Sequence, residues 1–128
     1  MTKDELNART KKFALDIIKL VDELPNTKAG HTVGNQIVRS STSVAANYRA
    51  SCKAKSAADF VYKMSIVEEE ADESLFWLEV IDESKMLPRE RVESLLLEAN
   101  ELTAIFTASG KTAKTNINIR KQTKYHKS

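Results

Sequence analysis

The apolar residues of this chain recur at steps of three and four, a spacing that places them on one face of an α-helix. The first such segment runs over about 6–24 and stops before Pro25, because proline disfavours helical geometry in the residue that precedes it. The second spans about 32–54, where a strip of small and polar side chains lets another helix approach closely. The pattern therefore predicts two helices joined by a polar turn over 26–30.

Two longer periodic segments follow. Ser56 and Asp59 predict a helix start, because the hydroxyl can accept from a free backbone amide and the acid suits the positive end of the helix dipole. Pro88 suits the first turn of a fourth helix, where its missing amide costs nothing. We expect that fourth helix to end at Gly110 or one turn later.

Strand signals are missing, and only 3 Gly and 2 Pro are available for tight turns. Four amphipathic helices with short connections predict an all-α fold, an up-down-up-down antiparallel four-helix bundle over residues 1–114. From residue 115 the periodicity is lost and the chain is polar and basic. We therefore expect residues 115–128 to form a basic, disordered C-terminal tail.

The third helix carries a second apolar strip away from its main stripe. Either this helix touches two neighbours inside the bundle, or the strip is a contact between subunits with aromatic anchors. Leu97 and Ile105, which lie off the stripe of the fourth helix, favour an oligomer. The candidate interface residues are Tyr62, Ile66, Trp77 and Val80.

Charge is unevenly distributed along the chain. Residues 28–63 hold six Lys or Arg and one acid, whereas residues 68–83 hold eight acids and no base. If the second and third helices are antiparallel, Arg39 lies near Glu70 or Glu73. The pattern predicts an ion pair, which either sets the packing register or has a binding role.

Basic residues are concentrated after residue 110. The first 110 residues carry 14 bases and 18 acids, so the net charge of +2 depends on the tail. A basic tail can follow a phosphate backbone by releasing counterions, or it can simply keep a protein soluble. The candidate nucleic-acid contacts are Arg49, Lys53, Lys55, Lys111, Lys114, Arg120, Lys121 and Lys124.

The patterns that indicate catalysis or a metal centre are missing. There is no Gly-rich phosphate loop, and no Glu-x-x-His pair accompanies Glu70 or Glu73 as a di-iron site requires. The chain has one Cys and two His, and no catalytic partner for the Cys52 thiol can be named from the sequence. We expect no enzymatic activity and no cofactor. The lone thiol and the lack of a long apolar run predict a cytoplasmic protein that does not bind membranes.

Three separated motifs resemble those of one bacterial family, that of the 23S ribosomal RNA intervening-sequence protein. They occur in the same order here, as QIVRSSTSVAANYRA (36–50), ADFVYKM (58–64) and EEADESLFWLE (69–79). Residues 101–109 and 111–114 are similar to the final helix of that family. The resemblance covers about residues 6–114.

The resemblance implies a left-handed up-and-down bundle that assembles as a homopentamer and has no known enzymatic activity. A similar fold serves as the accessory protein of diversity-generating retroelements, where a basic pentamer contacts nucleic acid and a reverse transcriptase. This chain departs from that analogy because its body is net negative. The family's marked positions correspond to Arg39, Ser43, Asn47, Glu70, Glu73 and Trp77.

The residues alone agree with those positions, Trp77 excepted. The helix pairing places Arg39 opposite Glu70 or Glu73, and helical spacing places Ser43 and Asn47 on the small polar strip of the second helix. We interpret Arg39, Ser43, Asn47, Glu70 and Glu73 as a structural polar seam, because polar residues inside a bundle set register and oligomeric state. Two functions stay open. The protein is an oligomeric module that binds RNA or a nucleic-acid-processing protein, or it is a protein-protein scaffold without nucleic-acid binding.

Overall fold

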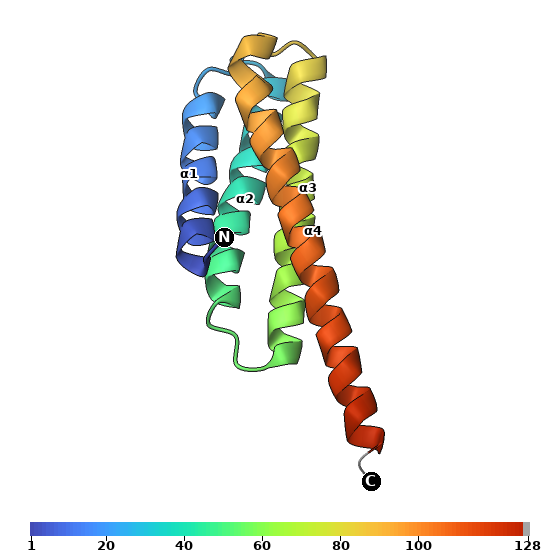
Figure 1. Ribbon diagram of the computed structural model, residues 1–128. Coiled ribbons are helices and arrows are strands. Elements are labelled where there is room, and N and C mark those ends of the chain that lie inside the picture. The colour runs from blue at the N-terminus through green and yellow to red at the C-terminus, as the bar shows by residue number, and fades with distance from the viewer. Residues whose placement is uncertain (127–128) are drawn as a thin grey trace.

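The computed structural model describes the backbone of residues 1–126 and the side chains of residues 1–123. Over that range the chain forms helices and no strand: α1 (Lys3–Val21), α2 (Lys28–Ser51), α3 (Ala57–Glu83) and α4 (Arg89–His126). Figure 1 shows the helices side by side, with each one running opposite to the one before it. The all-α four-helix bundle predicted from the sequence is confirmed.

The first three helices begin in the same way. Thr2, Thr27 and Ser56 each precede a helix, and the side-chain oxygen of each accepts from the backbone amide three residues later, at 3.0–3.1 Å. Each contact satisfies one of the free amides of a first helical turn. Asp59 adds a second contact, because its Oδ2 accepts from the amide of Lys55 at 3.1 Å. The helix start predicted at Ser56 is therefore confirmed.

The core runs along the interior of the bundle and draws on all of the helices. Its largest fully buried side chains include Ile17 and Leu20 of α1, Ile37 of α2, Leu78 of α3 and Phe106 of α4. Burying a side chain of this size contributes about 1.5–3 kcal/mol. The periodicity predicts Ile17, Ile37, Leu78 and Phe106 as core residues. It misses Leu20 and wrongly includes Ile18, which is 42% exposed.

Ion pairs tie α1 to α4 along the edge where those two helices meet. Arg9 donates from Nη2 to Glu98 Oε1 at 2.6 Å, and Arg91 donates from Nε to Glu23 at 2.8 Å. The stripes alone do not predict these pairs. They close the bundle between its first and last helices.

The C-terminal segment differs from the sequence prediction. Instead of a helix end near Gly110 and a disordered tail over 115–128, α4 continues to His126. Residues 111–126 contain no proline or glycine, and adding a residue to an existing helix avoids the cost of nucleation. Residues 127–128 lie outside the described range. Figure 1 shows the end of α4 projecting past the α2–α3 turn. We call residues 111–126 the extension; its first part still lies beside the start of α3, where Thr112 and Asn116 line a hollow with Ala57.

Candidate functional site

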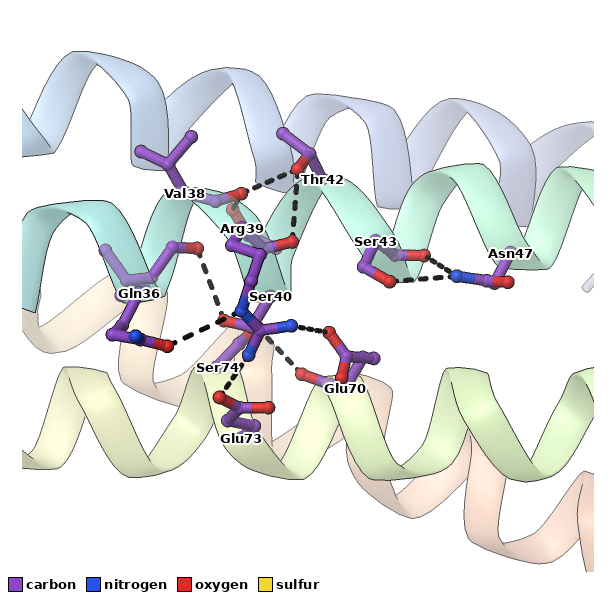
Figure 2. A network of polar contacts seen from close by, with 12 residues as sticks. Gln36, Val38, Arg39, Ser40, Thr42, Ser43, Asn47, Glu70, Glu73 and Ser74 are labelled. Carbon is purple, nitrogen blue, oxygen red and sulfur yellow. Dashed lines mark hydrogen bonds and ion pairs between the residues drawn. The ribbon is translucent and has the colours of Figure 1, made fainter.

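A charged cluster joins α2 to α3, as Figure 2 shows. The guanidinium of Arg39 donates from Nη1 to Glu70 Oε2 at 2.9 Å and from Nη2 to Glu73 Oε1. Its Nε lies 3.5 Å from Gln36 Oε1. The sequence predicts that Arg39 meets Glu70 or Glu73. That prediction is confirmed, and the structure adds that Arg39 pairs with both.

The cluster lies at the surface on its α2 side and is more buried on its α3 side. The Arg39 side chain is 50% exposed, whereas that of Glu70 is 15% exposed. The hydrogen bond from Arg39 lowers the pKa of Glu73, and the indole of Trp77, which donates to Glu73 Oε1 at 3.4 Å, acts in the same direction. The pKa of Arg39 is raised in turn, chiefly by its hydrogen bond to Glu73. Arg39 and Glu73 therefore both stay charged at neutral pH.

Two buried serines form a second contact between α2 and α3 beside this cluster (Figure 2). Ser74 Oγ lies 2.9 Å from Ser40 Oγ, and both residues are fully buried. Ser74 also bonds the backbone oxygen of Glu70 at 2.9 Å. The sequence analysis missed this pair. The sequence feature that could have revealed the pair is Ser74, which falls within the apolar stripe of the third helix, where a buried polar side chain needs a hydrogen-bond partner.

The predicted polar seam divides into two groups. Asn47 donates from Nδ2 to Ser43 Oγ at 2.8 Å and to the Ser43 backbone oxygen at 2.9 Å, so both residues are satisfied within α2. Arg39, Glu70 and Glu73 form the other group, across to α3. Figure 2 shows Ser43 and Asn47 farther along α2 than the charged cluster. The pairing of α2 with α3 therefore brings Arg39, Glu70 and Glu73 together. The side-chain amide of Asn47 hydrogen-bonds within α2 instead.

The buried polar side chains of the described part of the chain are paired. No buried side-chain nitrogen or oxygen of that part lacks a hydrogen-bond partner, and no three His, Cys, Asp or Glu are grouped to hold a metal. Cys52 is half-buried, and its Sγ accepts from Asn7 Nδ2 at 3.7 Å. Burial and the neighbouring Cys52 raise the pKa of Tyr48 to about 12, so its phenol stays protonated.

The predicted interface residues occupy different environments. Tyr62 is 64% exposed and Ile66 is half-buried, whereas Trp77 and Val80 are half-buried and pack against the core. The sequence analysis missed Phe76, which is 54% exposed and meets the Trp77 ring edge-on at a centroid distance of 4.9 Å. Part of the second strip therefore belongs to the bundle, and part of it faces outward.

The predicted nucleic-acid contacts gather at one end of the molecule. Arg49, Lys53 and Lys55 are exposed at the end of α2 and in the turn after it, the end from which the extension projects in Figure 1. Exposed bases also line the extension, and the side chain of Lys124 lies outside the described range. None of these bases is in an ion pair within the described part of the chain. The bases described on the extension are Lys111, Lys114, Arg120 and Lys121.

These features define a helical-bundle protein whose interior polar groups are paired with one another and whose basic residues face outward. The chain belongs to the 23S rRNA-intervening sequence protein family, whose model matches residues 3–108. The match ends before the extension. The resemblance inferred from the three motifs is thus confirmed.

A solved structure agrees with this family. It is the crystal structure of a protein with unknown function from the S23 ribosomal protein family of Bacteroides thetaiotaomicron, 32% identical, with a TM-score of 0.78. The similarity covers 87% of this chain and 99% of that chain. No curated protein matches this chain. No helix in the described range is long and apolar enough to cross a membrane.

The charged cluster predicts a pH-dependent contribution to stability. Because the folded-state pKa of Glu73 is lowered, its pairing stabilises the fold above the unfolded pKa, about 4.3, and this contribution is lost as the pH falls through the folded value. Replacing Arg39 with Gln should cost about 0.5–1 kcal/mol at pH 7, since solvent screens a half-exposed pair. Urea unfolding at pH 7 and pH 3 should show this difference shrinking in acid. An equal difference at both pH values would contradict the assignment.

Proposed function

We propose that this protein is a non-enzymatic, homo-oligomeric module that binds RNA through the extension and the adjacent end of α2. One observation carries the proposal: α4 continues past the α2–α3 turn, and the extension bears four exposed bases on described side chains and no acid. Its residues span about 24 Å at 1.5 Å per residue. Such a helix can contact several phosphates along a backbone.

The charge of the rest of the chain restricts binding to this end. The first 110 residues carry 14 bases and 18 acids, so most of the body repels a polyanion. Arg49, Lys53 and Lys55 are exposed at the end of α2 and in the α2–α3 turn, the end of the bundle from which the extension projects (Figure 1). The electrostatic attraction for a polyanion is therefore directed to the extension and to the α2–α3 turn at the same end of the bundle.

The composition of the extension indicates the mode of binding. The rings on which a base could stack, Tyr125 and His126, come only at the end of the extension, so contacts to phosphates and riboses dominate over the rest of its length. The family is named for the intervening sequence of 23S rRNA, which makes a structured fragment of that RNA the first ligand to test. We place this activity in the cytoplasm, whose reducing conditions suit a lone thiol.

Binding should depend steeply on salt. Fluorescence anisotropy with a labelled hairpin of bacterial 23S rRNA should show an affinity that falls as salt rises from 50 to 200 mM, because bound phosphates release counterions. Replacing Lys114, Arg120 and Lys121 together with Gln should weaken binding about tenfold or more at low salt. It should also reduce the slope of log affinity against log salt by about 2–3.

The matched control removes the same charge elsewhere. Lys19, Lys28 and Lys85 are exposed and lie toward the end of the bundle opposite the extension. Replacing these three with Gln should leave the slope nearly unchanged. Absence of binding by the folded wild type at 50 mM salt, or an equal loss in the control, would contradict the RNA proposal.

A separate observation favours the scaffold as the second candidate function. Large apolar side chains are exposed on helices far apart in sequence, including Leu15, Ile18, Tyr62 and Phe76. Aligned exposed apolar residues mark contacts with other chains. Light scattering should therefore give an oligomeric mass for the wild type. If this mass is unaffected by salt and by added RNA, and no RNA binds, the scaffold is the better description.

A further inference from the structure

A shallow groove of about 710 Å³ runs along the outside of the bundle between α1 and α2. Its floor contains small side chains, among them Ala8, Ala45 and Ala46. On its α1 side Leu15 is 50% exposed and Ile18 is 42% exposed. Nothing within the described chain covers these two large aliphatic side chains.

The rim of this groove is basic. Lys11 of α1, Arg49 at the end of α2 and Lys53 just after it line the groove and are exposed. None of them is in an ion pair with another described residue. An occupant of the groove therefore needs apolar side chains and acids on the same face.

The outer face of α3 has this composition. Tyr62, Glu69, Phe76 and Glu83 follow one another at steps of seven residues, and all four are exposed. Seven residues are close to two helical turns, so the four lie in one row, which we call the α3 stripe. Aromatic and acidic side chains alternate along it. Neither Glu69 nor Glu83 is in an ion pair within the described chain.

The groove and the stripe also match in spacing. On the groove side, the basic Lys11 and the apolar Ile18 are seven residues apart. On the stripe, Phe76 is seven residues from Glu69 and seven from Glu83, or about 10 Å in either direction. An aromatic ring of the stripe can thus lie against Ile18 while an acid one step away reaches Lys11.

We infer that the α3 stripe of one copy of this protein docks in the α1–α2 groove of a second copy. The two surfaces are on different helices of the same chain, so each copy can use both at once. Such a contact is head-to-tail, and it builds a closed ring when the rotation between copies closes. The inference rests on the proposal that the protein is a homo-oligomer, and it assigns the two surfaces that meet.

Two variants, each with one surface disabled, test this pairing. The groove variant carries Ile18→Glu and Arg49→Glu, which places acids against the incoming acids of the stripe. The stripe variant carries Tyr62→Glu and Phe76→Glu, which removes both aromatic rings. All four positions are exposed, so the helical circular dichroism should match that of the wild type.

Each variant alone should be monomeric by light scattering. An equimolar mixture should form a 1:1 dimer of twice the chain mass and nothing larger, because only one intact groove and one intact stripe remain between the two chains. Ile119→Glu with Lys28→Glu is the control. It makes the same kinds of change at exposed positions outside both surfaces, and it should leave the wild-type assembly intact.

The outcomes separate this inference from the proposed function. A monomeric wild type would overturn both the oligomer and the docking assignment. An oligomeric wild type whose mass the two variants leave unchanged would overturn the docking assignment alone. Monomeric variants that do not combine on mixing would overturn the head-to-tail pairing. The groove variant also lacks Arg49, a proposed RNA contact, so the docking assignment is decided by the measured masses and not by the affinity for the rRNA hairpin.

Discussion

Replacing Phe106 with Ala should lower the free energy of unfolding by about 3–5 kcal/mol, the largest effect we expect from a single substitution. The Phe106 side chain is fully buried, and its ring centroid lies 5.5 Å from that of Tyr48 on α2. Truncation removes this aromatic contact and leaves a cavity between α4 and α2. Phe106 is also the last large side chain that holds α4 to the bundle before the extension begins.

Urea unfolding followed by circular dichroism measures this loss. Leu97 supplies the matched control, because it lies on the same helix and is 65% exposed. Leu97→Ala should change the free energy of unfolding by less than about 0.5 kcal/mol. A loss at Phe106 as small as that at Leu97 would show that α4 does not pack against α2 as described.

Replacing Gly30 with Ala should cost about 1–3 kcal/mol, the range typical of overpacked sites. A Cβ atom at this position would lie only 2.0 Å from the backbone oxygen of Pro25. That oxygen is held in place, because it accepts from the amide of Thr27 at 2.9 Å. The turn before α2 must therefore open, which also disturbs the contact from the Gly30 amide to Thr27 Oγ1.

Gly34, one turn later, provides the comparison for this substitution. A Cβ atom there would lie 3.4 Å from Leu24 Cδ1, an ordinary contact. Gly34→Ala should leave stability unchanged or raise it by up to about 1 kcal/mol, because alanine is the better helix former. Thermal or urea unfolding of both variants separates the two cases. Equal effects at the two glycines would mean that backbone propensity alone decides them.

The register of the candidate site was predictable in part. An antiparallel pair of helices with a short turn brings Arg39 level with the acids of α3, and the structure shows the resulting pairs with Glu70 and Glu73. Periodicity does not say that both acids converge on one guanidinium. Periodicity also does not predict the contact between Ser40 and Ser74, because that contact depends on the distance between the axes of the two helices.

The second strip of α3 shows the same limit for the surface. Helical spacing places Tyr62, Trp77 and Val80 away from the main stripe, as predicted. Only the packing shows that Trp77 and Val80 are used within the bundle while Tyr62 and the overlooked Phe76 remain exposed. A helix in a bundle has two neighbours, and a sequence pattern does not distinguish the face of a neighbour from a face left to solvent.

The end of α4 was predicted wrongly because a local signal was given too much weight. Glycine after a periodic segment is typical of a helix end, where it adopts positive φ. No glycine in the described chain has positive φ. Gly110 is buried, and a Cβ atom at this position would lie 3.2 Å from Glu68 Oε2. Its small size suits a close approach of α4 to α3, so the helix passes through it.

By itself, the sequence determined the helical class, the four-helix bundle, the cap at Ser56, most of the buried stripes and the pairing of Arg39 with the acids of α3, because these depend on spacing along the chain. Only the tertiary structure decided which off-stripe side chains stay exposed, how the groove of α1 and α2 is lined, and that the basic C-terminal segment projects as a helix. These features depend on the distances and angles between helices, which arise when side chains from separate segments pack together.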